Sequence, residues 1–315
     1  MSAHLRTVAW LATAALGAVV GGVLGAADTE LLEDPRFERG LILWAPAPGK
    51  HERCGVLQRA GGAGGEPAWG LAQWSSRFAL QGSPGQPLAG GSLEARNEAK
   101  RVVLGAPGSP EADLILGINS GREYNDQLRR ARDPWPHLLI EQKLKDAPSL
   151  AQMEKLAFNV EYRINKTWIS RIQGWDDRFH TLHLQAFITV QNRNRQSPGF
   201  GDFLWFGVPL YDFRSPLPKG HAAMDTGSQK FIFTPHGEIF TKKSAHDGGW
   251  IAINKDLLPL MKEGLKLAWS KGYLGGSTNL ADFRPGAINL GWEAPGPGQA
   301  EAQIRGLSLK ASAKP

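Results

Sequence analysis

The chain has 315 residues, with 36 lysines and arginines against 30 aspartates and glutamates, so its formal net charge is +6. This small excess is spread along the chain, whereas nucleic-acid footprints are clustered, and we therefore expect no nucleic-acid partner. A single cysteine, Cys54, excludes an internal disulfide, so a large apolar core must stabilise the chain.

The first 27 residues have the order of features of a signal peptide. His4 and Arg6 form a short positive region ahead of an apolar run over residues 8–24. Small residues at 25–27 then precede the polar Asp28. We predict cleavage before Asp28 and a secreted or periplasmic protein. The alternative is an uncleaved membrane anchor, although the run is rich in Ala and Gly and no later stretch is apolar enough to span a membrane.

The sequence after residue 27 is typical of an all-β protein, because it is rich in Gly, Pro and Trp and its apolar runs are short. Residues 28–68 predict an irregular N-terminal segment. Residues 81–110 predict a long loop with at most one strand. There is no internal repeat and no sharp change of composition, so we predict a single domain over residues 28–315.

Clear strand patterns begin at residue 111. Strands are predicted at 112–118, 137–144, 158–164, 182–190 and 202–212, followed by a hairpin of 230–234 and 237–241 with its turn at Pro235-His236. Period two places His137 and Glu141 on one face of their strand. In the strand predicted at 182–190, the same period places His183 and Gln185 on the face opposite its apolar residues.

One helix interrupts the strands. Asn254 is its predicted cap, Asp256 lies in its predicted first turn, and an apolar stripe continues to about Ser270. A last pair of strands is predicted at 287–292 and 300–309. A run of strands with one late amphipathic helix indicates a jelly-roll β-sandwich.

Two segments place a carboxylate beside aromatic residues on a strand. Alternation puts Asp202 and Phe206 on one face, which suits a sugar cleft, because aromatic rings stack on sugars and the carboxylate meets the glycosidic carbon. The alternative is an Asp at the solvent-exposed end of a strand.

The second segment contains Glu293, which follows Trp292. Burial beside an aromatic ring raises the pKa of a carboxyl, as a general acid requires. The alternative is a strand-end Glu before a Pro-Gly turn.

From about residue 180 to 310 the order of elements resembles glycoside hydrolase family 12, the jelly-roll endoglucanases and xyloglucanases. Residues 202–206 resemble the family's nucleophile strand, the helix over 255–270 sits where the family has its long helix, and residues 291–296 resemble its final Gly-x-Glu-Pro segment. Trp74 corresponds to an early substrate-stacking Trp. The resemblance implies a retaining hydrolase in which Asp202 attacks the anomeric carbon and Glu293 is the acid/base. The family nucleophile is Glu, so Asp202 is one methylene shorter.

Further polar and aromatic residues are candidates for the same site. Glu141 and His183 are additional catalytic candidates, and the substrate-binding candidates are Trp74, His137, Gln185, Phe206 and Trp292. For the polar ones the alternative is a structural salt bridge on an exposed face. The histidines show no paired ligand spacing, so we expect no metal, and we expect no cofactor.

Three functions remain open for this chain. The first is an exported carbohydrate-active protein, and the specific enzyme considered is a retaining β-glycan endo-hydrolase. The second is a non-catalytic carbohydrate-binding protein of the cell envelope, in which Trp205 also presents a stacking surface. The third is a structural envelope protein without a ligand. The first requires Asp202 and Glu293 to face each other across one sheet.

Overall fold

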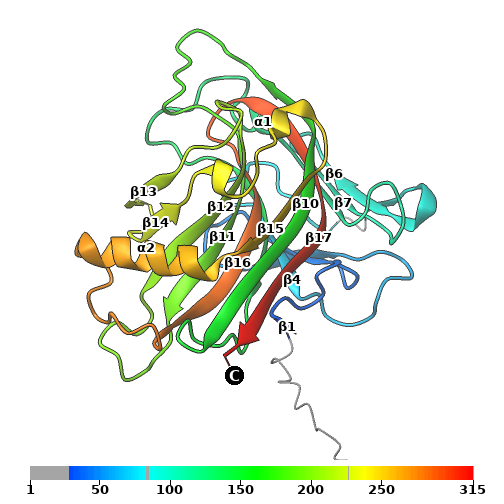
Figure 1. The fold of residues 1–315 in the computed structure, drawn as a ribbon. Helices are drawn as coiled ribbons and strands as arrows, with labels where there is room; N and C mark the ends of the chain where they lie inside the picture. Colours follow the sequence, from blue (N-terminus) through cyan, green and yellow to red (C-terminus); the bar gives the residue numbers. More distant parts are fainter. Residues whose placement is uncertain (1–27, 83–84, 226, 315) are drawn as a thin grey trace, which may run out of the picture.

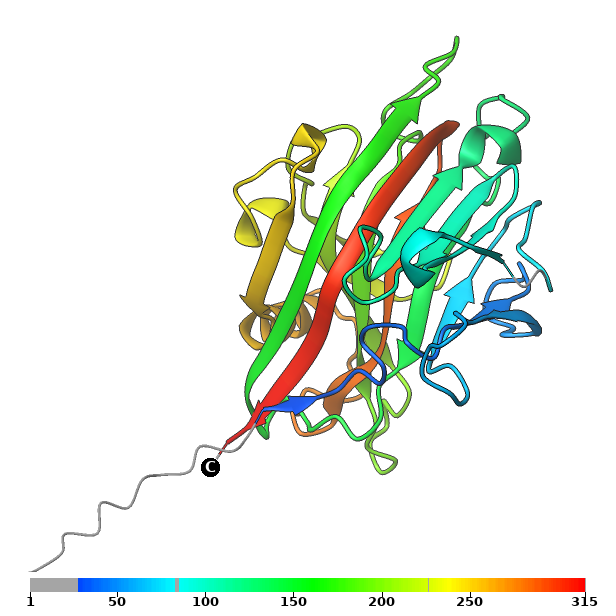
Figure 2. The same ribbon diagram turned by 90° about the vertical axis from the view of Figure 1, so that its right-hand side faces the viewer.

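The computed structural model describes residues 28–82, 85–225 and 227–314. The predicted signal peptide lies outside these residues. The described chain forms two β-sheets packed face to face (Figures 1 and 2). The predicted fold class, an all-β jelly-roll sandwich with a late amphipathic helix, is confirmed. Within the described ranges, none of the helices is long and apolar enough to cross a membrane.

The first sheet has eight strands in the described residues, in the order β15-β10-β17-β8-β7-β6-β5, with β1 paired to β17. Their bounds are β1 (Thr29–Glu30), β5 (Gln86–Pro87), β6 (Leu93–Arg96), β7 (Lys100–Leu104), β8 (Leu114–Asn119), β10 (Met153–Ile169), β15 (Ile251–Asp256) and β17 (Gly298–Ala313). The long strands β10 and β17 are antiparallel and run side by side as the green and red arrows of Figure 2.

The second sheet has nine strands in the described residues, in the order β13-β14-β12-β11-β16-β9-β4-β2-β3. Their bounds are β2 (Leu41–Trp44), β3 (Arg53–Leu57), β4 (Trp69–Ala72), β9 (His137–Lys143), β11 (His183–Asn192), β12 (Phe203–Asp212), β13 (His221–Met224), β14 (Phe231–Thr234) and β16 (Phe283–Glu293). The neighbours β9, β16, β11 and β12 are antiparallel to one another and form the middle of this sheet.

The core fills the space between the two sheets. The predicted alternation of β11 is confirmed, since Leu184, Ala186 and Ile188 are fully buried. Trp292 on β16 also points inward, and its indole N–H donates a hydrogen bond to the carbonyl oxygen of Leu116 at 2.9 Å. Because successive side chains of a strand point to opposite faces, the residues between these core positions face outward.

Helix α2 (Leu258–Ser270) packs against β10 of one sheet and β12 of the other (Figure 1, orange). Its predicted apolar stripe is confirmed, because Met261, Leu265 and Ala268 are buried. Its predicted start is wrong, because Asn254 and Asp256 belong to β15. The remaining helices are short: α1 (Ser120–Glu123) and the 3₁₀ turns η1 (Ala89–Gly91), η2 (Gly237–Ile239) and η3 (Ala245–Asp247).

Four further local predictions are corrected. Residues 28–68 contain β1 to β3, and residues 81–110 contain β5 to β7 rather than one strand at most. Residues 237–241 do not pair with β14, which instead lies antiparallel to β13 and parallel to β12. The last two strands, β16 and β17, lie in different sheets. In each case the partner strand is distant in sequence or too short to carry a clear period-two pattern.

Candidate functional site

A groove of about 720 Å³ lies on the outer face of the second sheet. Its floor is formed by β9, β16, β11 and β12, and loops around residues 177–178, 214–221 and 225–228 form its walls. The lining side chains that bear most on its chemistry are Trp74, Trp135, His137, His183, Gln185, Phe187, Trp205, Asp212, Arg214, Asn289 and Glu293. A groove with aromatic walls and a few converging polar groups is the usual form of a small-molecule or oligomer site.

Strand register brings four titratable residues into one row across the floor. His137 pairs with Glu293, Glu293 with His183, and His183 with Asp212. Adjacent strands lie about 4.8 Å apart, so the row is about 15 Å long. These residues are far apart in sequence, and Asp212 was not among the predicted site residues. The only local signal for Asp212 is an acid at the end of a strongly apolar strand.

His137 presents a basic nitrogen to Glu293. Its Nδ1 lies 2.9 Å from the carbonyl oxygen of Trp135, which can only accept, so Nδ1 carries the proton. Its Nε2 lies 3.9 Å from Oε2 of Glu293. Burial lowers the pKa of His137, although the nearby Glu293 carboxylate opposes this shift. Trp135 stacks on the imidazole at 5.8 Å and Trp74 lies 5.5 Å away. The imidazole is therefore neutral near pH 7.

His183 and Asp212 are tied to one arginine. Arg214 donates from Nη2 to Nε2 of His183 at 2.9 Å. Arg214 also donates to both oxygens of Asp212, from Nε at 2.9 Å and from Nη2 at 2.7 Å. A guanidinium only donates, so Nε2 of His183 is the unprotonated nitrogen. Burial would raise the pKa of Asp212, but the hydrogen bonds and the charge of Arg214 hold it at about 2. Asp212 is thus an ionised group whose charge is already compensated.

This clamp predicts a loss of stability in acid. Because the pKa of Asp212 is lower in the folded state than in the unfolded state, its ionised form stabilises the fold at pH values above 3.8, the unfolded pKa. This stabilisation disappears as the pH falls toward 2. The difference corresponds to about 2 kcal/mol. We expect Arg214→Gln to lower the free energy of unfolding by about 2 kcal/mol at pH 7 and to have less effect at pH 2.5. Urea unfolding at both pH values measures this, and an equal loss at both would contradict it.

Two buried polar atoms of the groove lack a protein partner. Asn289 lies on the floor with its side chain turned away from the core and only 7% exposed, and its Oδ1 accepts no hydrogen bond from the described residues. Nε1 of Trp135 likewise has no acceptor among them. Unpaired buried polar groups are costly unless something else binds them. The groove is therefore suited to a ligand that offers hydroxyl groups or other polar groups.

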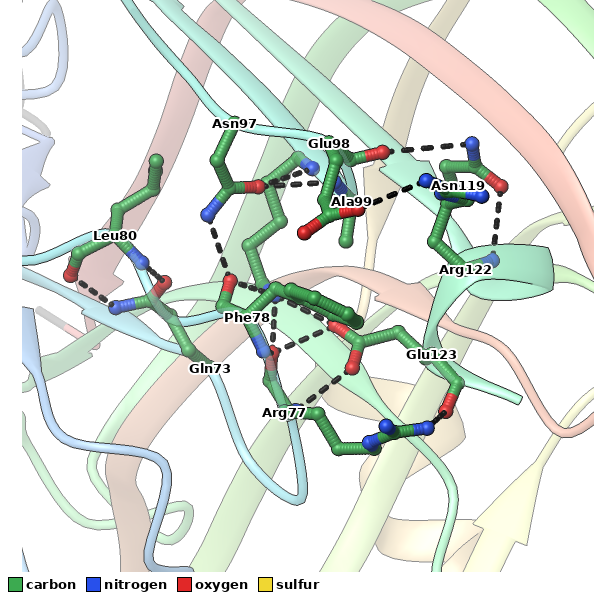
Figure 3. A network of polar contacts seen from close by, with 12 residues as sticks. Gln73, Arg77, Phe78, Leu80, Asn97, Glu98, Ala99, Asn119, Arg122 and Glu123 are labelled. Atoms are coloured by element: carbon green, nitrogen blue, oxygen red, sulfur yellow. Dashed lines mark hydrogen bonds and ion pairs between the residues drawn. The ribbon is translucent and has the colours of Figure 1, made fainter. Parts of the chain in front are cut away.

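The loop that carries Trp74 is anchored from beneath by a buried polar network (Figure 3). Gln73 donates to the carbonyl oxygen of Leu80 and accepts from its N–H. Glu123 accepts from the hydroxyl of Ser76 at 2.6 Å, and Oε1 of Glu123 lies 2.8 Å from Nζ of Lys100. Lys100 also donates to the hydroxyl of Ser76. The network fixes the backbone on both sides of Trp74.

The structure brings five of the predicted site residues together in the groove. They are Trp74, His137, His183, Gln185 and Glu293. Their placement agrees with the period-two assignment of outward faces in β9 and β11. Trp205 also lines the groove, and Phe187 and Phe203 pack against its ring at 5.9 and 5.1 Å. Trp205 is thus held upright on the outer face.

Phe206 and Trp292 cannot bind a substrate, because both side chains are fully buried between the sheets. In β12 both faces carry apolar residues, so alternation alone did not identify the inner one. In β16 Trp292 shares the inner face with Ile288 and Leu290, opposite Glu293. Glu141 lies on the outer face, but Oε1 lies 2.8 Å from Nε2 of His51. Burial raises the pKa of Glu141, and His51 opposes this. Glu141 does not line the groove.

Asp202 and Glu293 do not face each other. Glu293 pairs with His183 at the start of β11, whereas the Asp202 carbonyl accepts from the N–H of Asn192 at its end. Nine residues of extended strand separate these two points by about 30 Å. The Asp202 side chain is 46% exposed and lies 3.5 Å from Nζ of Lys230. The sheet therefore leaves the predicted nucleophile outside the groove.

No group of three or more His, Cys, Asp or Glu side chains in the described ranges is arranged to hold a metal ion. The residues of the groove instead offer acid–base and hydrogen-bonding chemistry. Glu293 lies 3.9 Å from Nε2 of His137, Gln185 and Asn289 offer amides, and the indoles offer flat apolar surfaces.

No family model matches the sequence, and no curated relative matches it. Among solved structures, the chain is similar to a family 12 xyloglucanase from Bacillus licheniformis, with 12% identity and a TM-score of 0.36 over 72% of this chain and 98% of that one. It is similar to the xyloglucanase domain of NopAA from Sinorhizobium fredii, with 9% identity and a TM-score of 0.35 over 70% and 97%. It is also similar to a family 11 xylanase from Neocallimastix patriciarum, with 8% identity and a TM-score of 0.34 over 70% and 95%.

Proposed function

We propose that the protein is exported, binds a polysaccharide in the groove and cleaves it with Glu293 as the proton donor. The observation that carries this proposal is the position of Glu293 on an aromatic-lined floor, 3.9 Å from the unprotonated nitrogen of a neutral His137. Export rests on the signal-peptide pattern of residues 1–27.

The shape and lining of the groove favour a sugar chain. Sugar rings have apolar faces that pack on flat aromatic surfaces, and Trp74, Trp135 and Trp205 supply such surfaces. Sugar hydroxyls both donate and accept hydrogen bonds, which suits the amides of Gln185 and Asn289. Asn289 has a buried oxygen still to be satisfied. An open groove on a sheet face also accommodates a long chain.

Hydrolysis of a glycosidic bond requires a water molecule that attacks the anomeric carbon and a proton for the leaving oxygen. Glu293 gives its proton to the leaving oxygen as the glycosidic bond breaks and the bond to water forms. The proton that the water loses returns to Glu293 through solvent and Nε2 of His137, which lies 3.9 Å from the carboxylate. A retaining mechanism with Asp202 as nucleophile has no support, because Asp202 lies at the other end of β11. Asp212 is the second carboxylate of the row, but Arg214 already binds both its oxygens.

The second candidate is a non-catalytic carbohydrate-binding protein. The Arg214–Asp212 clamp favours it, because a glycosidase of the usual kind needs two free carboxyl groups flanking the bond. In this function the row of titratable residues would bind hydroxyl groups, and the aromatic residues would supply most of the affinity. Binding without release of reducing ends is the outcome that distinguishes it.

A matched pair of tryptophan variants tests the groove as the glycan site. We expect Trp205→Ala to weaken binding of soluble β-glucan or xyloglucan by about tenfold, through loss of apolar contact. Trp168→Ala is the control, because Trp168 is 56% exposed on β10 of the other sheet. Titration calorimetry measures binding, and reducing-end release by the wild type measures cleavage. Equal affinities of the two variants for the glycan would contradict the proposal.

The export part of the proposal has its own test. We expect the protein recovered from outside the cytoplasm to begin at Asp28. N-terminal sequencing of that material measures this directly. A secreted or membrane-held product that still starts at residue 1 would show that the segment is retained as an anchor.

A further inference from the structure

A second groove of about 630 Å³ lies at the opposite ends of the strands that form the first. It is lined by Lys143, Leu144, Lys145, Asp146, Thr189, Gln191, Arg193, Phe200, Phe203, Gly286 and Ala287. Nothing in the chemistry proposed for Glu293 uses these residues. Its lining contains three cations and one carboxylate.

The two grooves adjoin each other on the outer face of the sheet, because their lining residues are successive outward positions on the same strands. On β11 the first groove is lined by Phe187 and the second by the next outward residue, Thr189. On β12 the first is lined by Trp205 and the second by Phe203. From His183 to Gln191 this trough extends about 27 Å along an extended strand. A chain of several sugar units therefore reaches both grooves at once.

Charge is distributed unequally along this trough. The lining of the first groove holds three cations and four carboxylates, and the cation beside the row, Arg214, is bound to Asp212. In the second, Lys145 is paired with Glu33 at 2.9 Å, but Lys143 and Arg193 are exposed and form no ion pair among the described residues. The charge of Lys143 acts on the nearby Glu141 carboxylate, but the groove lining as a whole keeps an excess of positive charge beside the exposed ring of Phe200, which makes it a surface for an anionic ligand. The guanidinium of Arg193 can bind a carboxylate through two parallel hydrogen bonds.

We infer that the polysaccharide is acidic and bears carboxylate groups, which Lys143 and Arg193 bind in the second groove while the bond to be cleaved lies at Glu293. This inference rests on the proposed function and adds its substrate class. Asp202 lies toward this end of the sheet, 3.5 Å from Nζ of Lys230, but it does not line the second groove.

An oligogalacturonate and its fully methyl-esterified form are suitable probes, because they share one backbone and differ in charge. We expect the wild type to bind the acid about tenfold more tightly than the ester at low salt. Exposed ion pairs are screened by salt, so the difference should shrink at high ionic strength. The double variant Lys143→Gln/Arg193→Gln should weaken binding of the acid by about tenfold and bring it close to the ester.

The control is Lys242→Gln/Lys243→Gln, which removes the same charge from exposed positions that line neither groove. It should leave both affinities unchanged, and thermal melting should show that both double variants are folded. Equal binding of acid and ester, or equal losses in the two double variants, would overturn the inference while leaving the proposed function intact. If neither probe nor any neutral glucan binds, the proposed function itself fails.

Discussion

Replacing Glu293 with Gln is expected to lower the rate of glycan cleavage by a factor of about 10² to 10⁴, the usual contribution of a general acid. Glutamine keeps the shape and hydrogen bonding of the side chain but cannot donate a proton to the leaving oxygen. Affinity for the glycan should change far less than the rate. Initial rates of reducing-end release, with binding measured separately, separate the two effects.

Asp202→Asn is the matched control for that experiment. It removes one carboxylate from a residue about 30 Å along the sheet from Glu293, so cleavage should be unaffected. His137→Gln should alter the pH dependence of the rate, because Nε2 of His137 faces Glu293. If Glu293→Gln cleaves at the wild-type rate, Glu293 is not the donor. If Asp202→Asn is inactive, the assignment made from the family resemblance is restored.

The second large effect concerns the buried Lys100–Glu123 pair, which binds the hydroxyl of Ser76 in the loop that carries Trp74. Glu123→Gln is expected to lower the free energy of unfolding by about 3–5 kcal/mol, because it leaves the charge of Lys100 buried without a counter-ion. The side chains of Lys100 and Glu123 are 0% and 2% exposed. Burial lowers the pKa of Lys100, and Glu123 opposes this shift. Chemical denaturation at pH 7 measures the loss.

A surface pair provides the comparison for this variant. Arg122 and Glu98 lie 3.0 Å apart beside the same network, but both side chains are about half exposed (Figure 3). Glu98→Gln should therefore cost less than about 1 kcal/mol. Equal losses for Glu98→Gln and Glu123→Gln would show that the buried pair has no special role. The Glu123→Gln variant should also bind the glycan less tightly than Glu98→Gln, because the network holds the loop that carries Trp74.

Local sequence patterns were sufficient for the all-β class, the late helix and the outward faces of two central strands. In residues 182–190 every second position is apolar and faces the core. His183 and Gln185, which lie between these positions, therefore face outward, and both line the groove. The same logic placed His137 correctly. These features follow from neighbouring residues, because strand and helix periodicity is a local property of the chain.

The composition of the sites depended on tertiary structure. In β12 both faces are apolar, so period two could not distinguish the core position of Phe206 from the groove position of Trp205. Shifting the strand by one residue exchanges its inner and outer faces, so it decides which side chains a ligand can contact. The short strands in the Gly- and Pro-rich segments were missed for another reason, because two to five residues are too few to show a period-two pattern.

The sequence by itself determined which residues alternate in the long central strands and that one long helix follows them. Only the tertiary structure decided which of these residues meet. His137, His183, Asp212 and Glu293 form one row because four strands distant in sequence align in register, and Asp202 is excluded because its antiparallel strand begins at the opposite edge of the groove. That register is set by the burial of whole sheet faces against each other, which no local pattern encodes.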